Sequence, residues 1–138
     1  MLSTVDKVEI LKMVPLFAGL ETRDLLLISL VTSEEEFSAQ EILFEQGEQG
    51  DELFVLASGV LEVLKSEDKK EPCMVAEIKE GQCVAELALF ADAPRTATLR
   101  AKESSVLLIL SGLILHELML EHPRLGLGMI RTLVRRYS

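Results

Sequence analysis

The sequence predicts a mainly β domain with flanking helices, because its hydrophobic period changes twice along 138 residues. Apolar residues recur at helical spacing before about residue 31 and again after Leu110. Between Glu34 and Leu110, short apolar runs are cut by Gly, Pro, Asp or Glu at roughly the 8–12-residue spacing of small sandwiches and barrels. Hydrophobic residues make up 49% of the chain and Trp is absent. One domain over residues 1–138 is therefore expected, with a core of Leu, Val, Ile and Ala.

The N-terminal part, about residues 4–31, is expected to form two short helices. Ser3 or Thr4 can cap the first helix, and Thr22 is the expected N-cap of the second. The residues expected on the buried face of the first helix are Val5, Val8 and Leu11.

The central part, about residues 34–110, is expected to hold about eight short strands separated by turns. Ser58-Gly59 lies between two apolar runs and predicts a hairpin. The segment KSEDKKEP predicts a solvated hairpin tip, and Gly81 can adopt positive φ in a further turn. The glycines interpreted as turn residues are Gly47, Gly50 and Gly59.

The C-terminal part, about residues 111–137, is expected to form two helices. Ser111 can cap the first, and Pro123 suits the first position of the last. The apolar stripe expected on the last helix is Met129, Ile130, Leu133, Val134 and Tyr137. Its arginines, Arg131, Arg135 and Arg136, are interpreted as favourable charges at a helix C-terminus. Gly126 and Gly128 leave a hinge and close packing both open.

Charge and composition exclude several classes of partner. The net charge of −9 is a poor match for a nucleic-acid backbone or an anionic lipid surface. The longest apolar run, from Val106 to Leu115, is too short to span a bilayer, and the N-terminus does not resemble a signal peptide. Cys73 and Cys83 are expected to be reduced thiols. A cytoplasmic location is expected, either alone or as the cytosolic domain of a larger, membrane-associated protein.

The sequence predicts no catalytic residues, no metal site and no cofactor. The only histidines, His116 and His122, both lie outside the strand region. A metalloenzyme that binds its ion on a β-roll would need several histidines there. No nucleophile–base pair is visible either, so an enzyme ranks last among the hypotheses.

The strand pattern breaks between Gly81 and Thr98, in GQCVAELALFADAPRTAT. Ala, Glu and Leu favour a helical turn here, and the first amides of such a turn favour an anion. Arg95 can bind a phosphate bidentately, whereas Glu86 is an acceptor pair suited to vicinal hydroxyls. Together they fit a ligand with a phosphate and a sugar hydroxyl on one rigid body. As two isolated charges, the same residues would instead form an ion pair that closes a loop.

These residues and their surroundings resemble the cyclic nucleotide-binding domains of catabolite-activator proteins, cyclic-nucleotide-dependent kinases and gated channels. The resemblance covers nearly the whole chain and is carried by VPLFAGL, FSAQEILFEQGEQGDELFVLASGVLEVL and GQCVAELALFADAPRTATLRA. It implies an eight-stranded antiparallel β-roll, a jelly-roll-like double-stranded β-helix, between N-terminal and C-terminal helices. It also implies a phosphate-binding cassette, in which a Gly-Glu-x-Ala segment precedes Arg-x-Ala.

The resemblance implies cAMP or cGMP as the ligand. Glu86 would bind the ribose 2′-hydroxyl and Arg95 the cyclic phosphate. The backbone amides of Leu87 and Ala88 would add phosphate contacts. Thr96 suits a bond to the phosphate or to a guanine amino group, so cAMP and cGMP both stay open.

The chain departs from the family pattern at Val84-Ala85, where Phe-Gly is usual. Ala85, counted here among the ligand-binding residues, would be strained by about 1 kcal/mol or more if its φ is positive. Two hypotheses follow. The first is a regulatory module that binds a cyclic nucleotide and relays binding through its C-terminal helices, with Leu125, Met129 or a partner chain capping the base. The second is a degenerate fold that binds no nucleotide and acts as a protein-interaction domain.

The expected partners are a cyclic nucleotide and an unidentified effector domain or protein, without nucleic acid. An excised domain of a larger protein is favoured over a stand-alone sensor, because no DNA-reading, kinase or channel segment follows the last helix. A homodimer through the C-terminal helix is also left open.

Overall fold

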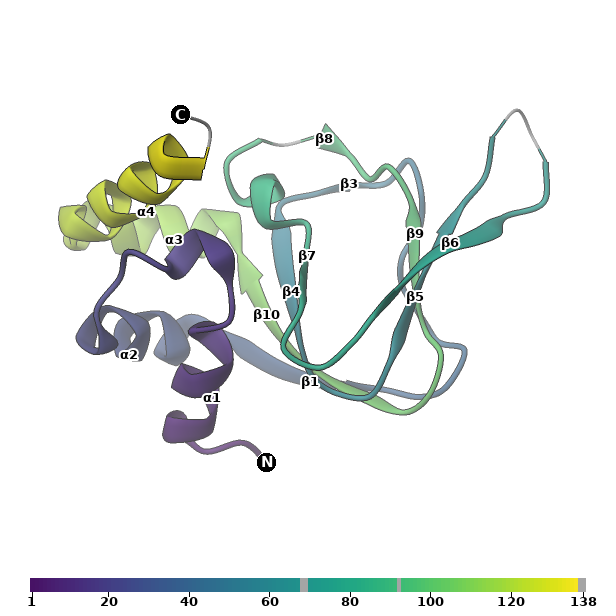
Figure 1. Ribbon diagram of the computed structural model, residues 1–138, viewed down its shortest axis with the longest axis horizontal. Helices are drawn as coiled ribbons and strands as arrows, with labels where there is room; N and C mark the ends of the chain where they lie inside the picture. Colours follow the sequence, from purple (N-terminus) through teal and green to yellow (C-terminus); the bar gives the residue numbers. More distant parts are fainter. Residues whose placement is uncertain (68–69, 92, 137–138) are drawn as a thin grey trace.

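The computed structural model describes residues 1–67, 70–91 and 93–136, in which a β-roll lies beside a cluster of helices (Figure 1). The first helical elements are α1 (Thr4–Leu11), the 3₁₀ turn η1 (Pro15–Phe17) and α2 (Thr22–Val31). The last are α3 (Gly112–Glu121) and α4 (Pro123–Arg136). Both groups lie on the same side of the roll, so the N-terminal and C-terminal helices pack together (Figure 1). The mainly β class with flanking helices is confirmed.

Ten short strands lie within the described ranges, and eight of them form two four-stranded antiparallel sheets. One sheet has the order β1-β10-β4-β7 and the other β2-β9-β5-β6, while β3 and β8 pair separately. The strands are β1 (Ser33–Phe37), β2 (Ile42–Phe44), β3 (Gln49–Gly50), β4 (Glu52–Ser58), β5 (Leu61–Lys65), β6 (Cys73–Ile78), β7 (Cys83–Val84), β8 (Ala93–Pro94), β9 (Thr98–Ala101) and β10 (Ser105–Ser111). A 3₁₀ turn, η2 (Glu86–Leu89), lies between β7 and β8.

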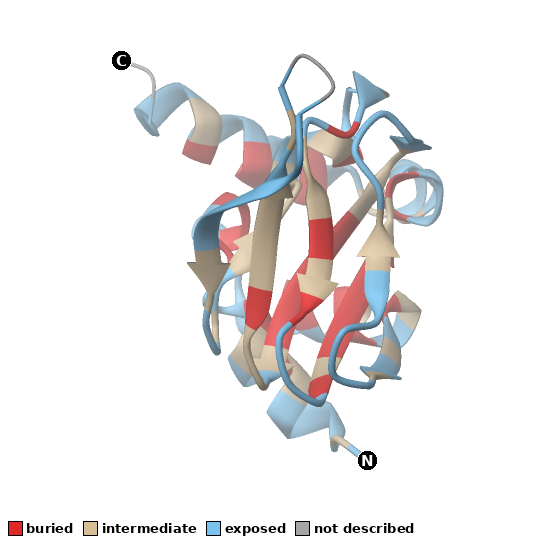
Figure 2. Ribbon diagram, turned by 90° about the vertical axis from the view of Figure 1, so that its right-hand side faces the viewer, coloured by how far each residue is buried: buried red, intermediate tan, exposed pale blue. Residues whose placement is uncertain are grey.

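The central strands β4 and β10 are buried on both faces (Figure 2). Along β4, Leu53 and Val55 pack with the helices, whereas Phe54 and Leu56 pack inside the roll. Successive side chains of a strand point to opposite faces, so one strand supplies two hydrophobic clusters. This explains why β10 reads as a continuous apolar run, and it fixes the roll against the helices.

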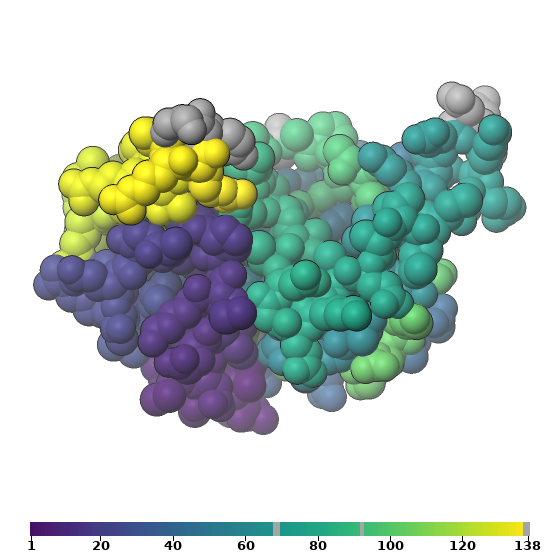
Figure 3. Space-filling model, viewed as in Figure 1, coloured from purple at the N-terminus to yellow at the C-terminus, as the bar shows by residue number. Residues whose placement is uncertain are grey.

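The predicted hairpin at Ser58-Gly59 is wrong. β4 and β5 belong to different sheets, so this turn is a corner between the sheets. Gly59 is nevertheless a turn residue, with a positive φ of 103°, and an added Cβ would lie 2.7 Å from the carbonyl oxygen of Ser104. The Ser58-Gly59 dipeptide correctly predicts a turn, but it does not indicate which strands pair with each other. The predicted β5–β6 hairpin is confirmed and projects from the roll (Figure 3), with residues 68–69 outside the described ones.

The N-terminal helices differ from expectation at two positions. Ser3 caps α1 in a reciprocal bond with Asp6, as predicted, but Val5 is 70% exposed and does not join the buried face. The cap of α2 is Glu21 rather than Thr22. Glu21 and Asp24 form a reciprocal capping pair, which shifts the start of the helix by one residue.

The buried face of α4 is also different from the predicted stripe. Leu125 and Met129 are buried, but Ile130 and Val134 are exposed; Tyr137 lies outside the described residues. The reason is that α4 packs through its small residues. An added Cβ at Gly128 would lie 2.6 Å from Cδ2 of Leu20, and one at Gly126 would lie 3.0 Å from Cε of Met119.

Close packing is thus the observed role of the two glycines in α4. Their missing side chains let the helix approach the η1–α2 connection and α3. Gly19 completes this contact, because an added Cβ there would lie 2.8 Å from the carbonyl oxygen of Gly128.

Candidate functional site

A cavity of about 420 Å³ opens in the roll beside η2. Its volume lies within the range of about 300–1,000 Å³ that is typical of small-molecule sites. The lining residues are Phe44, Val63, Val84, Ala85, Leu87, Ala88, Ala91, Ala93, Pro94, Arg95, Thr96, Ala97, Thr98 and Leu99. Most of this wall is apolar, and Arg95 is the one charged side chain among these lining residues.

The backbone of Arg95 is fixed by the loop before β3. The amide of Arg95 donates to the carbonyl of Glu48 at 2.7 Å, and the amide of Gly47 donates to the carbonyl of Arg95 at 2.8 Å. The positive φ of Gly47, 93°, confirms its interpretation as a turn residue. These two bonds place the side chain of Arg95 against β2 and β4.

The guanidinium of Arg95 is buried, with only 8% of the residue exposed. Its nitrogens Nη1 and Nη2 donate to the carbonyl oxygen of Glu52 at 3.4 and 3.3 Å, which are long bonds. Its Cζ lies 4.4 Å from the centroid of the Phe44 ring and 5.7 Å from that of Phe54. Two aromatic rings therefore flank a cation that has no short hydrogen bond within the described residues.

Gly50 makes room for this guanidinium. An added Cβ would lie 2.5 Å from Nη2, 2.8 Å from Nε and 2.9 Å from Cζ of Arg95. Gly50 belongs to β3 and has no positive φ, so its interpretation as a turn residue is wrong. Its small size is required by Arg95, not by the backbone.

Burial and nearby carboxylates act on Arg95 in opposite directions. Burial lowers the pKa of Arg95, whereas Glu52, Asp51 and Glu48 raise it. Burial also raises the pKa of Glu52, with a further increase from Asp51. Among the described residues no ion pair to Arg95 is formed, so a buried cation without an ion-pair partner faces the cavity. Such a group favours an anionic ligand.

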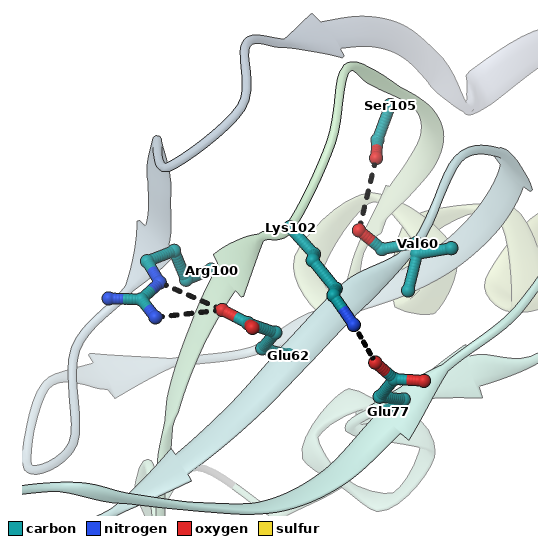
Figure 4. A network of polar contacts seen from close by, with 6 residues as sticks. All are labelled: Val60, Glu62, Glu77, Arg100, Lys102 and Ser105. Atoms are coloured by element: carbon teal, nitrogen blue, oxygen red, sulfur yellow. Dashed lines mark hydrogen bonds and ion pairs between the residues drawn. The ribbon is translucent and has the colours of Figure 1, made fainter.

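Arg100 shows the contrast on the outer side of the roll (Figure 4). Its Nε and Nη2 both donate to Oε2 of Glu62, at 3.0 and 2.8 Å, directly across β5 and β9. Lys102 pairs with Glu77 next to them. Arg100 and Lys102 are thus each paired with a carboxylate, whereas Arg95 has no ion pair among the described residues.

Ala85 precedes η2 in the left-handed conformation, with φ 65° and ψ 35°. The carbonyl of Ala85 accepts from the amide of Ala88 at 3.1 Å, so this amide is used within the turn. By the geometry of a 3₁₀ turn, the amide of Leu87 has no acceptor inside the helix. Of the two backbone amides predicted to bind phosphate, only that of Leu87 is thus not used in a hydrogen bond within the turn.

We expect Ala85→Gly to raise the free energy of unfolding by about 0.5–1 kcal/mol. The left-handed conformation costs a non-glycine residue about 1–2 kcal/mol, which exceeds the entropy that glycine adds to the unfolded chain. Urea unfolding would measure the difference. Ala88→Gly, in the same turn without positive φ, is the matched control and should destabilise the fold. A loss of stability in Ala85→Gly would contradict the strain.

Glu86 is turned toward the helices. Its Oε2 accepts from the amide of Leu16 at 2.7 Å, and its Oε1 accepts from Nη1 of Arg136 at 2.7 Å. Its side chain is 12% exposed, and it does not line the cavity. Glu86 and Arg95 are therefore not partners of each other. Arg136 does more than favour the end of α4, because it ties that helix to η2.

The other expected site residues lie either in the wall of the cavity or in the helical core. Thr96 is exposed in the cavity wall, as is Leu87. Leu125 and Met129, the expected caps for a base, are buried in the helical core and do not reach the cavity.

The wall also includes residues that the sequence did not single out. They are Phe44, Val63 and Thr98. Gly50, interpreted from the sequence only as a turn residue, lies behind Arg95. The Oγ1 of Thr98 accepts from the amide of Gln46 at 2.9 Å. Phe44 and Val63 lie in β2 and β5, which reach the cassette by pairing with β9, so no local motif marks these two residues.

The histidines and cysteines lie outside the cavity. His122 is the C-cap of α3, and Nε2 of His116 lies 2.6 Å from the carbonyl oxygen of Leu89. Cys73 and Cys83 are free, and burial raises the pKa of Cys83 to about 11. Within residues 1–67, 70–91 and 93–136, no cluster of His, Cys, Asp or Glu is arranged to hold a metal ion.

Comparisons with known proteins agree on one family. Residues 34–122 match the model of the cyclic nucleotide-binding domain. The chain is 32% identical over 97 residues to a cAMP-dependent protein kinase regulatory subunit from Dictyostelium discoideum, covering 70% of this chain and 30% of that protein. It is 32% identical over 92 residues to the cGMP-dependent protein kinase, isozyme 2 forms cD5/T2, from Drosophila melanogaster, covering 66% of this chain and 10% of that protein.

A solved structure shows the same fold over nearly the whole length. It is the N-terminal domain of a transcriptional regulator from Streptomyces coelicolor A3(2), with a TM-score of 0.87 and 28% sequence identity. The match covers 93% of this chain and 91% of that one. In contrast, the chain spans less than a third of the length of the two kinase relatives. No helix in the described part of the chain is long and apolar enough to cross a membrane.

Proposed function

Because the chain belongs to the cyclic nucleotide-binding domain family, we propose that its cavity binds cAMP or cGMP and that the domain is regulatory. The observation that carries this proposal is the buried guanidinium of Arg95, which lacks an ion pair among the described residues and faces an otherwise apolar cavity. The cyclic phosphate would meet Arg95 and the amide of Leu87. The sugar and base would lie against the apolar wall, and Thr96 is available to the phosphate or to a guanine amino group.

Calorimetric titration of the domain with cAMP and with cGMP tests this proposal. Saturable heat with at least one of them is expected, and adenosine is the control that lacks the phosphate. Absence of heat with both nucleotides at high micromolar concentration would refute the proposal. That result would favour the alternative, a degenerate fold that serves protein interaction, which the strain at Ala85 supports.

Glu86 supports a route by which binding would reach the helices. Its carboxylate joins η2 to the amide of Leu16 before α2 and to Arg136 at the end of α4. A contact with the ribose hydroxyl would require Glu86 to give up at least one of these bonds. The nucleotide and the end of α4 would then compete for one carboxylate, and such differential contact is what couples binding to a conformational change.

We expect Arg136→Ala to raise the affinity for the cyclic nucleotide by about two- to fivefold. The substitution removes a half-exposed ion pair, worth about 0.3–1 kcal/mol, that holds Glu86 away from the ribose. Calorimetry would measure the change. Arg135→Ala removes a neighbouring charge without a known bond to Glu86 and should have little effect. An unchanged or weaker affinity in Arg136→Ala would rule out this competition.

A second copy of the chain is the proposed partner of α4. Leu127, Ile130 and Val134 are exposed at i, i+3 and i+7, the spacing of a coiled-coil seam. Two such stripes related by a two-fold axis would cover each other. Sedimentation equilibrium should then show a dimer, and a monomer at high micromolar concentration would contradict it.

The remaining features of the proposal concern the whole protein. The domain is proposed to be a non-catalytic, cytosolic part of a larger protein, with an effector that the chain does not identify. Mass determination of the native protein in its source cells would test this, since a native chain of only 138 residues would contradict it.

A further inference from the structure

The guanidinium of Arg95 lies over the ring of Phe44 and beside Gly50. Its Cζ lies 4.4 Å from the centroid of the Phe44 ring. An added Cβ at Gly50 would lie 2.5 and 2.8 Å from Nη2 and Nε but 2.9 Å from Cζ, so the missing side chain at Gly50 leaves space beside the edge formed by these two nitrogens. The ring of Phe44 forms no ion pair, and Nη1 and Nη2 make only long bonds to the carbonyl oxygen of Glu52, at 3.4 and 3.3 Å, so the N–H groups can still donate to an anion.

Phe44 is itself fixed in place. It lies in β2, lines the cavity, and packs against Phe54 with ring centroids 5.4 Å apart and a tilt of 50°. Phe54 is almost fully buried in the roll. A ring anchored in this way can orient a cation, and the attraction is larger where water is excluded.

We propose that Phe44 is a positioning residue, whose ring orients the guanidinium of Arg95 toward the cavity in place of an ion pair. This inference depends on the proposed nucleotide site, because it assigns the way in which that site holds its cation. A carboxylate at the same place would also hold Arg95, but it would occupy an N–H edge and neutralise the charge. An aromatic ring leaves the N–H edge and the positive charge available to the phosphate.

The test compares Phe44→Leu, Phe44→Met and Phe44→Tyr with the unchanged chain. Leucine and methionine keep an apolar group of similar size but remove the π face, whereas tyrosine keeps it. Phe37→Leu is the matched control, since Phe37 is a half-buried phenylalanine of the same hydrophobic cluster. Two quantities are measured: the affinity for cAMP and cGMP by calorimetry, and the chemical shift of the Arg95 Nε–Hε group by NMR without ligand. The loss of this signal in Arg95→Lys assigns it.

The expected result is a loss of about three- to tenfold in affinity for Phe44→Leu and Phe44→Met. Phe44→Tyr should stay within about twofold of the unchanged chain, as should Phe37→Leu. In the ligand-free protein, the Nε–Hε signal should lose its ring-current shift in the leucine and methionine variants only. An unchanged signal in these variants would overturn the inference, whatever happens to affinity. If the unchanged chain binds neither nucleotide, the proposed function fails, and the NMR measurement alone decides whether Phe44 positions Arg95.

Discussion

Arg95→Ala is expected to lower the affinity for cAMP and cGMP by at least about 30-fold, in most assays to no measurable binding. The guanidinium is the one charged group among the lining residues, and it is almost completely removed from water. Truncating one partner of a buried, hydrogen-bonded charge pair costs about 2–5 kcal/mol. A cyclic phosphate placed in this apolar cavity without Arg95 would be an unpaired buried charge.

The same substitution should leave the fold nearly intact. The side chain of Arg95 makes only long hydrogen bonds, to the carbonyl of Glu52, and its burial lowers its pKa because it disfavours the charged form. Replacing a buried charge that has no ion pair therefore removes little stabilising energy. Calorimetry would measure affinity, and urea unfolding would measure stability.

Arg100→Ala is the matched control for Arg95→Ala. Arg100 lies on the adjacent strand β9, but its charge is paired with Glu62 on the outer side of the roll. Its loss should not change the affinity. If cyclic nucleotide binding survives Arg95→Ala unchanged, the phosphate does not bind at Arg95 and the assignment of the site is wrong.

How far the site was predictable depends on where each contact comes from. Arg95, Thr96 and Ala85 belong to one continuous segment, so the sequence could place them together, and the strain at Ala85 followed from its side chain. The sequence also identified Glu86 as a hydrogen-bond acceptor, but it could not predict in which direction the side chain points. Its partners, Leu16 and Arg136, lie 70 and 50 residues away and are brought to it by helix packing.

The fold shows the same division between local and distant causes. Ser111 is both the last residue of β10 and the N-cap of α3. The sequence could predict this cap because the strand and the helix are adjacent in the chain. Gly59 is equally clear as a turn, but whether its strands pair with each other depends on β9 and β10, about 40 residues later. Likewise, the exposure of Ile130 and Val134 follows from glycines that bring the opposite side of α4 against Gly19 and Leu20.

Gly50→Ala is expected to lower the affinity for the cyclic nucleotide by about 10- to 100-fold without a comparable loss of stability. The added Cβ would lie 2.5 Å from Nη2 of Arg95, too close for any real contact. The atom in the way is the end of a flexible side chain, so Arg95 can move and the backbone of β3 need not. The displaced guanidinium would lose its place at the cavity, and a hydrogen bond to a charged group is worth about 1.5–3 kcal/mol.

Gly81→Ala separates this effect from a general response to losing a glycine. Gly81 has a φ of 85° and lies away from the cavity wall, with Met13 at ordinary contact distance. Its substitution should cost about 1–2 kcal/mol of stability, because of backbone strain, and leave affinity unchanged. Gly50 has no positive φ, so Gly50→Ala adds no such backbone strain. Gly50→Ala should therefore lose affinity but little stability, whereas Gly81→Ala should lose stability but no affinity. An unchanged affinity in Gly50→Ala would mean that Arg95 does not need its place against β3 to bind the phosphate.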